Sequence, residues 1–228
     1  MTLMLDLLRF WIFTEFLRLI LMISFRHNAI FVHIPKCAGQ SVEAAFLHDI
    51  SPSLDWDRHR HLLACFEKPA SWSAAFPGRL AHLTAEEYVG LSFVSQEVWD
   101  DCFKFTIVRD PVDRMLSAWK YLNIREDFDT FSKKLLPKAV ADGQFFFRSQ
   151  CDYLMLKGQD KVAVDLVLSI KKLRQDWSQV QQRCGLRSEL GKRNATGQKD
   201  SPPVTAYAAA AIREIDSRDY ELLGEYFC

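Results

Sequence analysis

The 228-residue chain carries no net charge, because its 29 basic residues are matched by 29 acidic ones. A neutral chain has no general attraction for nucleic acid, so we expect no nucleic-acid partner and any anion site must be local. No uncharged stretch reaches the roughly 18 residues that a membrane span requires, which argues against a transmembrane helix. The sequence also lacks repeats and low-complexity segments, which favours one globular domain.

The six cysteines are widely spaced and form no C-x-x-C pair, so zinc-finger and thioredoxin-type motifs are absent. Reduced thiols, with no metal required, are therefore the default expectation. Disulfides remain an alternative in an oxidising compartment, where Asn194-Ala195-Thr196 would be a glycosylation sequon.

Residues 1–26 are strongly apolar, but four charged residues interrupt them: Asp6, Arg9, Glu15 and Arg18. Their i,i+3 spacing predicts a helix over residues 1–28, which either packs on a domain formed by 29–228 or contacts a membrane through 1–26. Early acidic residues and the lack of a small-residue cleavage site fit a secretory signal poorly. We expect a cytoplasmic location; peripheral membrane attachment is an open alternative, and the Golgi lumen is a less favoured one.

Strand-like and helix-like segments alternate along residues 29–228. Short apolar runs predict strands at 29–34, 103–108 and 162–168. Periodic patterns predict helices at 41–47, 169–183 and 206–227, with a further helix beginning at Asp110-Pro111. The alternation indicates a P-loop-like, three-layer α/β fold in which a central, mostly parallel sheet is flanked by helices. In the helix from Asp110, five apolar residues have the spacing of a core face: Val112, Met115, Leu116, Trp119 and Leu122.

The junction between the first strand and its helix reads Pro35-Lys36-Cys37-Ala38-Gly39-Gln40-Ser41. A turn that leaves a strand and enters a helix directs successive backbone N–H groups into one concavity, where the positive helix end favours an anion. Lys36 adds a mobile charge, Gly39 permits close approach of the backbone, and Ser41 can donate its hydroxyl. Taken alone, the pattern is equally compatible with a plain strand-to-helix turn.

A second strand-to-helix junction follows residues 103–108. Arg109 leaves the strand at its carboxyl end, where open α/β sheets gather ligand-binding groups, and its planar guanidinium suits a terminal phosphate. Asp110 and Pro111 mark the start of the next helix. Ser117 lies two turns into that helix on a face away from the core, a face that it shares with Asp113 and Lys120.

Residues 31–41 and 107–118 together resemble the paired signatures of carbohydrate-type sulfotransferases, the heparan- and chondroitin-like group with a His-Ile-Pro-Lys loop. The looser part of the resemblance covers residues 147–150, 173–177, 194–196 and 219–220. It implies the donor 3′-phosphoadenylyl sulfate (PAPS), the product 3′,5′-ADP, no metal, and a hydroxylated acceptor of the carbohydrate class.

The resemblance also assigns roles to individual residues. Lys36 and Ser41 correspond to the loop that binds the 5′-phosphosulfate of the donor, and Arg109 and Ser117 correspond to the site of its 3′-phosphate. This chain departs from the family at two positions, with Cys37 where Thr is frequent and Gln40 where a small hydroxyl residue is usual. Because such loops bind through backbone donors, neither departure need abolish binding.

Sulfuryl transfer needs in-line attack by the acceptor hydroxyl and neutralisation of the departing phosphate, a role that the resemblance gives to Lys36. The attacking hydroxyl must also lose a proton, which requires a general base of moderate pKa. His82 resembles a histidine that precedes the second motif in related enzymes, and it is the favoured base. The other candidates for the base are Glu43, Glu86 and His33.

Other functions stay open on the sequence. The apolar strand before Asp110 imitates the magnesium-binding motif of nucleotide hydrolases, as an ATP- and magnesium-dependent phosphotransferase would need, but no G-x-x-x-x-G-K-[ST] loop accompanies it. Cys37 at a helix start could be a nucleophile, although no partner is identifiable. A catalytically inactive binding protein on the same fold is the remaining alternative, and the intact candidate site disfavours it.

Overall fold

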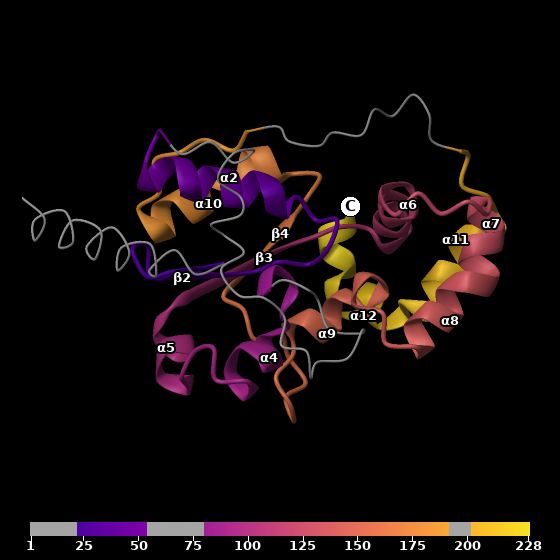
Figure 1. The fold of residues 1–228 in the computed structure, drawn as a ribbon, viewed down its shortest axis with the longest axis horizontal. Helices are drawn as coiled ribbons and strands as arrows, with labels where there is room; N and C mark the ends of the chain where they lie inside the picture. The colour runs from indigo at the N-terminus through magenta and orange to yellow at the C-terminus, as the bar shows by residue number, and fades with distance from the viewer. Residues whose placement is uncertain (1–21, 54–79, 192–201) are drawn as a thin grey trace, which may run out of the picture.

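The computed structural model describes residues 22–53, 80–191 and 202–228. Its centre is a four-stranded sheet in the order β1-β2-β3-β4 (Figure 1). The strands are β1 (Ile23–Ser24), β2 (Ala29–Val32), β3 (Phe103–Val108) and β4 (Leu166–Ser169). β1 pairs antiparallel with β2, and the other two pairings are parallel. This confirms the α/β fold with a mostly parallel sheet.

Helices cover both faces of the sheet. On one face lie α2 (Gly39–Ile50) and α10 (Leu173–Cys184), while α4 (Ala85–Gly90), α5 (Gln96–Asp101) and α9 (Gln150–Leu154) lie on the other (Figure 1). The short helix η2 (Leu80–His82) precedes α4. The sheet is thus the middle of three layers, as the alternation of strands and helices predicts.

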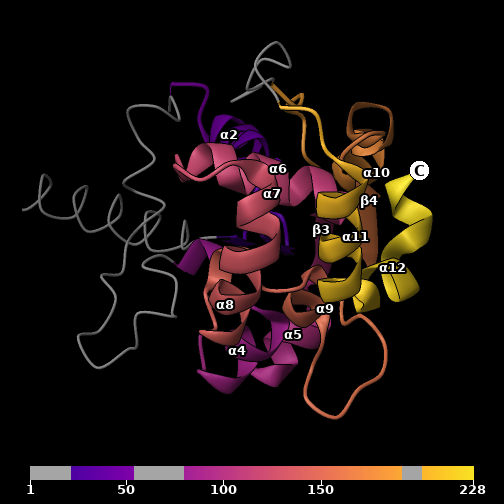
Figure 2. The same ribbon diagram turned by 90° about the vertical axis from the view of Figure 1, so that its right-hand side faces the viewer.

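A group of helices packs beside these layers and forms a second apolar core (Figure 2). Its elements are α6 (Pro111–Tyr121), α7 (Phe128–Thr130), η3 (Phe131–Leu135), α8 (Leu136–Ala141), η4 (Phe145–Phe147) and α11 (Ala206–Ile215). The chain then returns to the sheet through α12 (Ser217–Leu223) and η6 (Gly224–Phe227). α6 therefore connects the end of β3 with this helical group.

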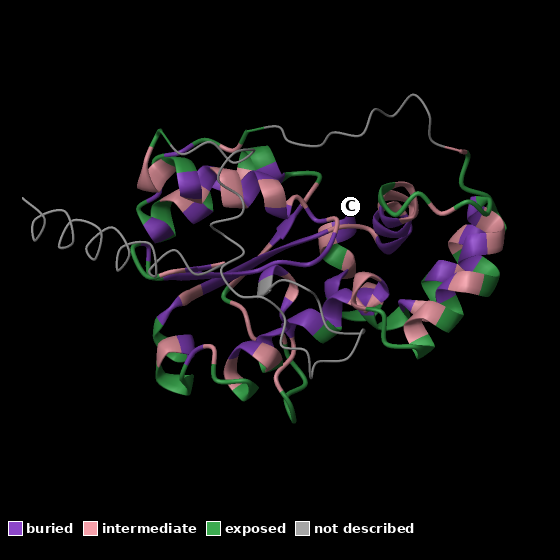
Figure 3. Cartoon of the chain, viewed as in Figure 1, coloured by how far each residue is buried: buried purple, intermediate pink, exposed green. Residues whose placement is uncertain are grey.

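The central strands are buried on both sides, as Figure 3 shows. Strands covered on both faces need largely apolar runs; AIFV is apolar throughout, and FKFTIV is apolar apart from Lys104 and Thr106. The one hydroxyl in this part of β3, on Thr106, donates to the Val32 carbonyl at 2.8 Å. Because β2, β3 and β4 run parallel, the residues after all three strands meet at one edge of the sheet.

Several expected boundaries differ from the observed ones: the first strand ends at Val32 instead of residue 34, and the helix expected at 41–47 spans Gly39–Ile50. The strand expected at 162–168 occupies 166–169, and the helix expected from 169 begins at Leu173, because a turn with the Lys172 N–H on the Ser169 carbonyl intervenes. The helix expected over 206–227 is broken at Asp216 and Gly224. Leu122, expected in the core, is 40% exposed because it follows the end of α6.

Residues 1–21 lie outside the described part of the chain, so the predicted N-terminal helix stays a prediction. Its expected last residues, 22–28, instead form β1 and the turn that leads into β2. Among the described helices, none has the length and apolar character to cross a membrane. Five cysteines are described, all as free thiols, while Cys65 and the sequon at Asn194 fall outside the described ranges.

Candidate functional site

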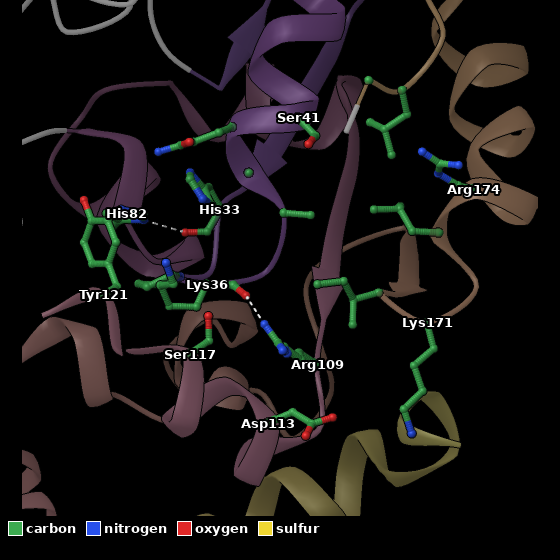
Figure 4. A pocket seen from close by; sticks show the side chains of 18 of the residues that line it. His33, Lys36, Ser41, His82, Arg109, Asp113, Ser117, Tyr121, Lys171 and Arg174 are labelled. Carbon is green, nitrogen blue, oxygen red and sulfur yellow. Dashed lines mark hydrogen bonds between the residues drawn. The ribbon is translucent and has the colours of Figure 1, made fainter. Parts of the chain in front are cut away.

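A cavity of about 560 Å³ lies at the edge where the parallel strands end. Pro35 and Lys36 follow β2, Arg109 follows β3, Ile170 follows β4, and all four line the cavity (Figure 4). Ligands of open α/β sheets bind outside the carboxyl ends of the strands. The fold therefore places this cavity where a ligand site is expected.

The structure brings both sequence motifs to this one cavity, although Lys36 and Arg109 are 73 positions apart in the chain. The cavity is lined by all the predicted donor-binding residues except Cys37, namely Pro35, Lys36, Ala38, Gly39, Gln40, Ser41, Arg109 and Ser117. The guanidinium Nη1 of Arg109 lies 3.5 Å from the carbonyl oxygen of Lys36 and donates to it (Figure 4). The two motifs are thus in direct contact.

The loop after β2 owes its shape to two residues in the left-handed region, Lys36 at φ 68° and Ala38 at φ 61°. Alternating backbone handedness of this kind turns consecutive N–H groups toward one point. The prediction of successive free donors is only partly right, because the Cys37 N–H donates to Ile34 and the Ser41 N–H donates to Ala38. The hydrogen bonds of the described residues include none from the N–H groups of Ala38 and Gly39.

Position 39 has no room for a side chain, so it requires glycine. A Cβ at this position would lie 1.7 Å from Nε2 of His33, so the imidazole fills the volume that any larger residue would need. The ring of His33 is itself fixed against that of Phe31, with centroids 5.4 Å apart. The loop can enter α2 in this conformation only because the residue there has no side chain.

Cys37 points away from the cavity and is fully buried. Its thiol lies 3.7 Å from the Pro35 carbonyl and 3.6 Å from Oε1 of Gln150. Burial raises the pKa of the Cys37 thiol to about 12, although the nearby guanidinium of Arg114 acts in the opposite direction. Neither the thiol nor the N–H of Cys37 is presented to the cavity, which disfavours Cys37 as a nucleophile and gives its assignment to donor binding no support from the cavity wall.

The Lys36 side chain lines the cavity and places its ammonium 3.9 Å from the centre of the Tyr121 ring. Burial lowers the pKa of Lys36, and the positive charge of Arg109 lowers it further. Two cations are therefore held close together at the cavity, an arrangement that an anionic ligand would stabilise.

Arg109 is positioned through its backbone by the side-chain amide of Gln150. The Arg109 N–H donates to Oε1 of Gln150 at 3.0 Å, and Nε2 of Gln150 donates back to the Arg109 carbonyl at 2.8 Å. Oε1 of the same amide also accepts from the Cys37 thiol. Gln150 is fully buried and so links the segment after β2 to the segment after β3.

Asp219 of α12 holds the side-chain amide of Gln150 in place through hydrogen bonds. One carboxylate oxygen of the fully buried Asp219 accepts from the Gln150 backbone N–H at 2.9 Å and from its Nε2 at 3.1 Å. The other accepts from the Ser149 hydroxyl and from the Cys151 N–H. A buried charge with this many donors is well stabilised, so the network is a rigid support for Arg109.

Asp110 is a helix cap, as the sequence predicts. Its Oδ1 accepts from the N–H groups of Val112 and Asp113, and its Oδ2 accepts from the Tyr220 hydroxyl at 3.2 Å. Within the described residues, no cluster of three or more histidine, cysteine or acidic side chains could hold a metal ion.

α6 presents one face to the cavity through Asp113, Ser117 and Tyr121. These residues are four positions apart, the spacing that places side chains on one side of a helix. Asp113 and Ser117 were expected to share a face, but Tyr121 was not recognised, and Lys120 is not in the cavity wall. The i, i+4, i+8 spacing was the available signal for Tyr121.

His82 lines the cavity near Lys36 (Figure 4), with its Nδ1 3.1 Å from the carbonyl oxygen of His33. A carbonyl only accepts, so in the neutral ring the proton lies on Nδ1 and the lone pair on Nε2. The ring also stacks on Phe145, with centroids 5.6 Å apart. This fixed tautomer is the one a general base needs.

The other base candidates are placed less favourably. His33 lines the cavity, but its Nδ1 faces Glu43 at 3.3 Å without hydrogen-bond geometry, and its ring packs against Gly39. Glu43 lies behind His33 and is not in the cavity wall. Glu86 lies elsewhere, where its carboxylate accepts from the Lys157 N–H at 2.8 Å.

The sequence assigned no role to the end of the cavity formed by the segment after β4 and the loop after α10, although Leu173 and Arg174 lie in the stretch 173–177 that loosely resembles the family. Ile170, Leu173 and Leu190 give this end an apolar surface, and Arg174 lines it as well. Lys171 also lies there, but its ammonium donates to the Phe227 carbonyl at 2.5 Å. Ile170 and Leu190 belong to no motif of the sequence, and the helix expected from residue 169 placed Ile170 inside a helix instead of in the loop after β4.

Comparison with known proteins identifies a family whose model matches most of the chain. The model described as “Sulfotransferase family” matches residues 20–223, which is most of the chain and includes every element that builds the cavity. No curated protein and no solved structure gives a significant match.

Proposed function

Because the chain belongs to the sulfotransferase family, we propose that it transfers the sulfuryl group of PAPS to an acceptor hydroxyl and releases 3′,5′-ADP. The observation that carries the proposal is the convergence of Lys36 and Arg109 on one cavity at the carboxyl edge of the sheet. A donor with anionic groups at both the 5′ and the 3′ position needs two such cationic sites.

The residues around the cavity suggest how the donor lies. The 5′-phosphosulfate is assigned to the loop after β2, with Lys36 and Ser41, where the start of α2 favours an anion. The 3′-phosphate is assigned to Arg109 and Ser117. The apolar surface of Ile170, Leu173 and Leu190 is then available for the adenine ring.

In the proposed reaction the acceptor oxygen forms a bond to sulfur while the bond from sulfur to the 5′-phosphate oxygen breaks. Lys36 neutralises the charge that develops on the departing phosphate. Nε2 of His82 takes the proton of the acceptor hydroxyl, and the His33 carbonyl on Nδ1 stabilises the imidazolium that forms. No covalent enzyme intermediate is required.

The resemblance of both motifs to carbohydrate-type enzymes favours a sugar hydroxyl as the acceptor. An ATP- and magnesium-dependent phosphotransferase is disfavoured, since both oxygens of Asp110 are engaged as a helix cap and with Tyr220. An inactive binding protein is disfavoured by the complete set of cavity residues, including a fixed His82 tautomer.

The test is sulfuryl transfer from radiolabelled PAPS by the full chain to a panel of pyranosides and simple alcohols, with and without EDTA. We expect a sulfated pyranoside in both conditions, none with Lys36→Ala, and a kcat lowered about 10²- to 10⁴-fold by His82→Ala. In His82→Ala the affinity for 3′,5′-ADP should be preserved. A wild-type chain that neither transfers sulfate nor binds 3′,5′-ADP would contradict the proposal.

A further inference from the structure

An aromatic surface runs along the cavity wall from His82 to Lys36. The rings of Phe146 and Tyr121 both line the cavity and stack on each other, with centroids 5.6 Å apart and planes inclined by 14°. The His82 ring meets Phe146 edge-on at 6.1 Å. The two residues assigned to the chemistry, His82 and Lys36, are therefore connected by a continuous series of aromatic contacts.

This wall is held in place from within the protein. The fully buried Arg114 donates to the Phe146 carbonyl at 3.4 Å and to the Arg148 carbonyl at 2.7 Å. The Tyr153 hydroxyl donates to the carbonyl of Phe145, the preceding residue. Phe146 thus lies on a fixed support, and Tyr121 rests against it at the last residue of α6.

Tyr121 is nevertheless 57% exposed, so much of its side chain is accessible to a ligand. The ammonium of Lys36 lies 3.9 Å above its ring. A cation is attracted to the electron-rich face of an aromatic ring, so this contact holds Lys36 against the wall while no anion is bound. In the proposed reaction the same ammonium must move onto the phosphosulfate, which leaves the ring face uncovered beside the reacting sulfur.

We propose that the face of Tyr121 is the binding platform for the acceptor, covered by Lys36 in the free protein and uncovered when the donor binds. The inference rests on the proposed function. The ligand class is a neutral pyranose presenting its C–H face, because polarised C–H groups are attracted to the same electron-rich surface as an ammonium. A sugar lying on the face of Tyr121 that Lys36 covers shares the cavity with His82, where a hydroxyl can lose its proton.

The proposal predicts that acceptor binding depends on the nucleotide. With Lys36 on the ring, the platform is occupied; with 3′,5′-ADP in the donor site, the ammonium is drawn to the 5′-phosphate. We expect a pyranoside that is sulfated in the transfer assay to bind the 3′,5′-ADP complex and to bind the free protein at least about fivefold more weakly.

The variants that test the platform are Tyr121→Leu and Tyr121→Phe. Tyr121→Leu should tighten binding of 3′,5′-ADP about two- to fivefold, because Lys36 loses its competing contact. It should also raise the KM for the pyranoside about five- to tenfold. Tyr121→Phe keeps the ring and should restore both values.

The chain offers a matched control in Tyr207. It is 46% exposed and carries Lys133 at 4.5 Å above its ring, but it lies on α11 and outside the cavity wall. Tyr207→Leu removes an equivalent pair and should change neither the nucleotide affinity nor the KM. Melting temperatures of all three variants establish that they are folded.

The outcomes separate the two proposals. If the wild type transfers sulfate and Tyr121→Leu leaves both the KM and the affinity for 3′,5′-ADP unchanged, the platform is refuted and the proposed function stands. Equal acceptor binding with and without 3′,5′-ADP refutes the covering by Lys36. A wild-type chain that binds no 3′,5′-ADP refutes the proposed function, and the platform with it.

Discussion

The two segments that meet in the cavity are held in different ways. The segment after β2 takes its shape from its own backbone, with Lys36 and Ala38 in the left-handed region and Gly39 pressed against a histidine ring. The segment after β3 has no residue in the left-handed region and is held from outside, because the side-chain amide of Gln150 bonds both the backbone N–H and the carbonyl of Arg109.

The two segments differ in how far along the sequence the residues that fix their conformation lie. The determinants of the first segment lie within a few residues of it, whereas those of the second lie 41 positions away at Gln150 and, through that residue, 69 positions further on at Asp219. Substitutions near the first segment should therefore damage it directly. The second segment should be sensitive to buried residues that never touch the ligand.

Gly39→Ala is expected to have the largest effect. The new Cβ would overlap the His33 ring at 1.7 Å, so the ring must move and the loop must open. We expect transfer to be abolished and the free energy of unfolding to fall by about 1–3 kcal/mol, as for overpacking in a rigid site. Thermal and denaturant unfolding measure the second effect.

The control for this substitution removes the His33 ring, which the new Cβ would otherwise overlap. His33→Ala frees the space, so the double variant His33→Ala/Gly39→Ala should unfold at the same temperature as His33→Ala alone. A Gly39→Ala protein with the stability and donor affinity of the wild type would show that the backbone of this loop is not constrained as described.

Gln150→Met should have a smaller and more specific effect. It keeps the side-chain volume but leaves Arg109 without its backbone partners, so the guanidinium is no longer aimed at the 3′-phosphate. We expect the preference for 3′,5′-ADP over 5′-AMP to drop about tenfold, the size expected for lost buried hydrogen bonds. Titration calorimetry with both nucleotides measures this ratio, which a simple loss of folded protein would leave unchanged.

Gln175 on α10 is the matched control, because it is exposed and lies outside the cavity wall. Gln175→Met should keep the wild-type preference between the two nucleotides. An unaltered preference in Gln150→Met would mean that the amide supports the fold but does not position Arg109.

The smallest expected effect is a pH dependence of donor binding. Burial and the neighbouring Arg109 lower the pKa of Lys36, so the free protein loses this charge at a lower pH than the ordinary lysine value of 10.5. Bound phosphate favours the charged form and raises the pKa again. Affinity for 3′,5′-ADP should therefore fall as the pH rises through the lowered pKa, and binding in that range should take up a proton.

Calorimetry in two buffers of different ionisation enthalpy detects this proton uptake. Arg109→Ala removes one cause of the lowered pKa, so the pH range of proton uptake should move upward in that variant. Binding without proton uptake at every alkaline pH would indicate that Lys36 does not contact the nucleotide.

The contrast between the segments also explains which features of the structure can be predicted from the sequence. The two strand-to-helix junctions, the cap at Asp110 and the core strands follow local patterns, and the structure contains them. Gln150 and Asp219 lie in segments that resemble the family only loosely. The neighbouring sequence of a single Gln or Asp does not show that its side chain will be buried. The placement of Tyr121 beside Lys36 depends on tertiary packing and could not be derived from spacing alone.

The central claim is that one nucleotide spans both segments, with its 5′-phosphate at Lys36 and its 3′-phosphate at Arg109. The most direct test is the affinity of the wild type, Lys36→Ala and Arg109→Ala for 3′,5′-ADP and 5′-AMP. We predict a strong wild-type preference for 3′,5′-ADP, lost in Arg109→Ala, while Lys36→Ala weakens both nucleotides by the same factor. An Arg109→Ala protein that still prefers 3′,5′-ADP as strongly as the wild type would contradict the account.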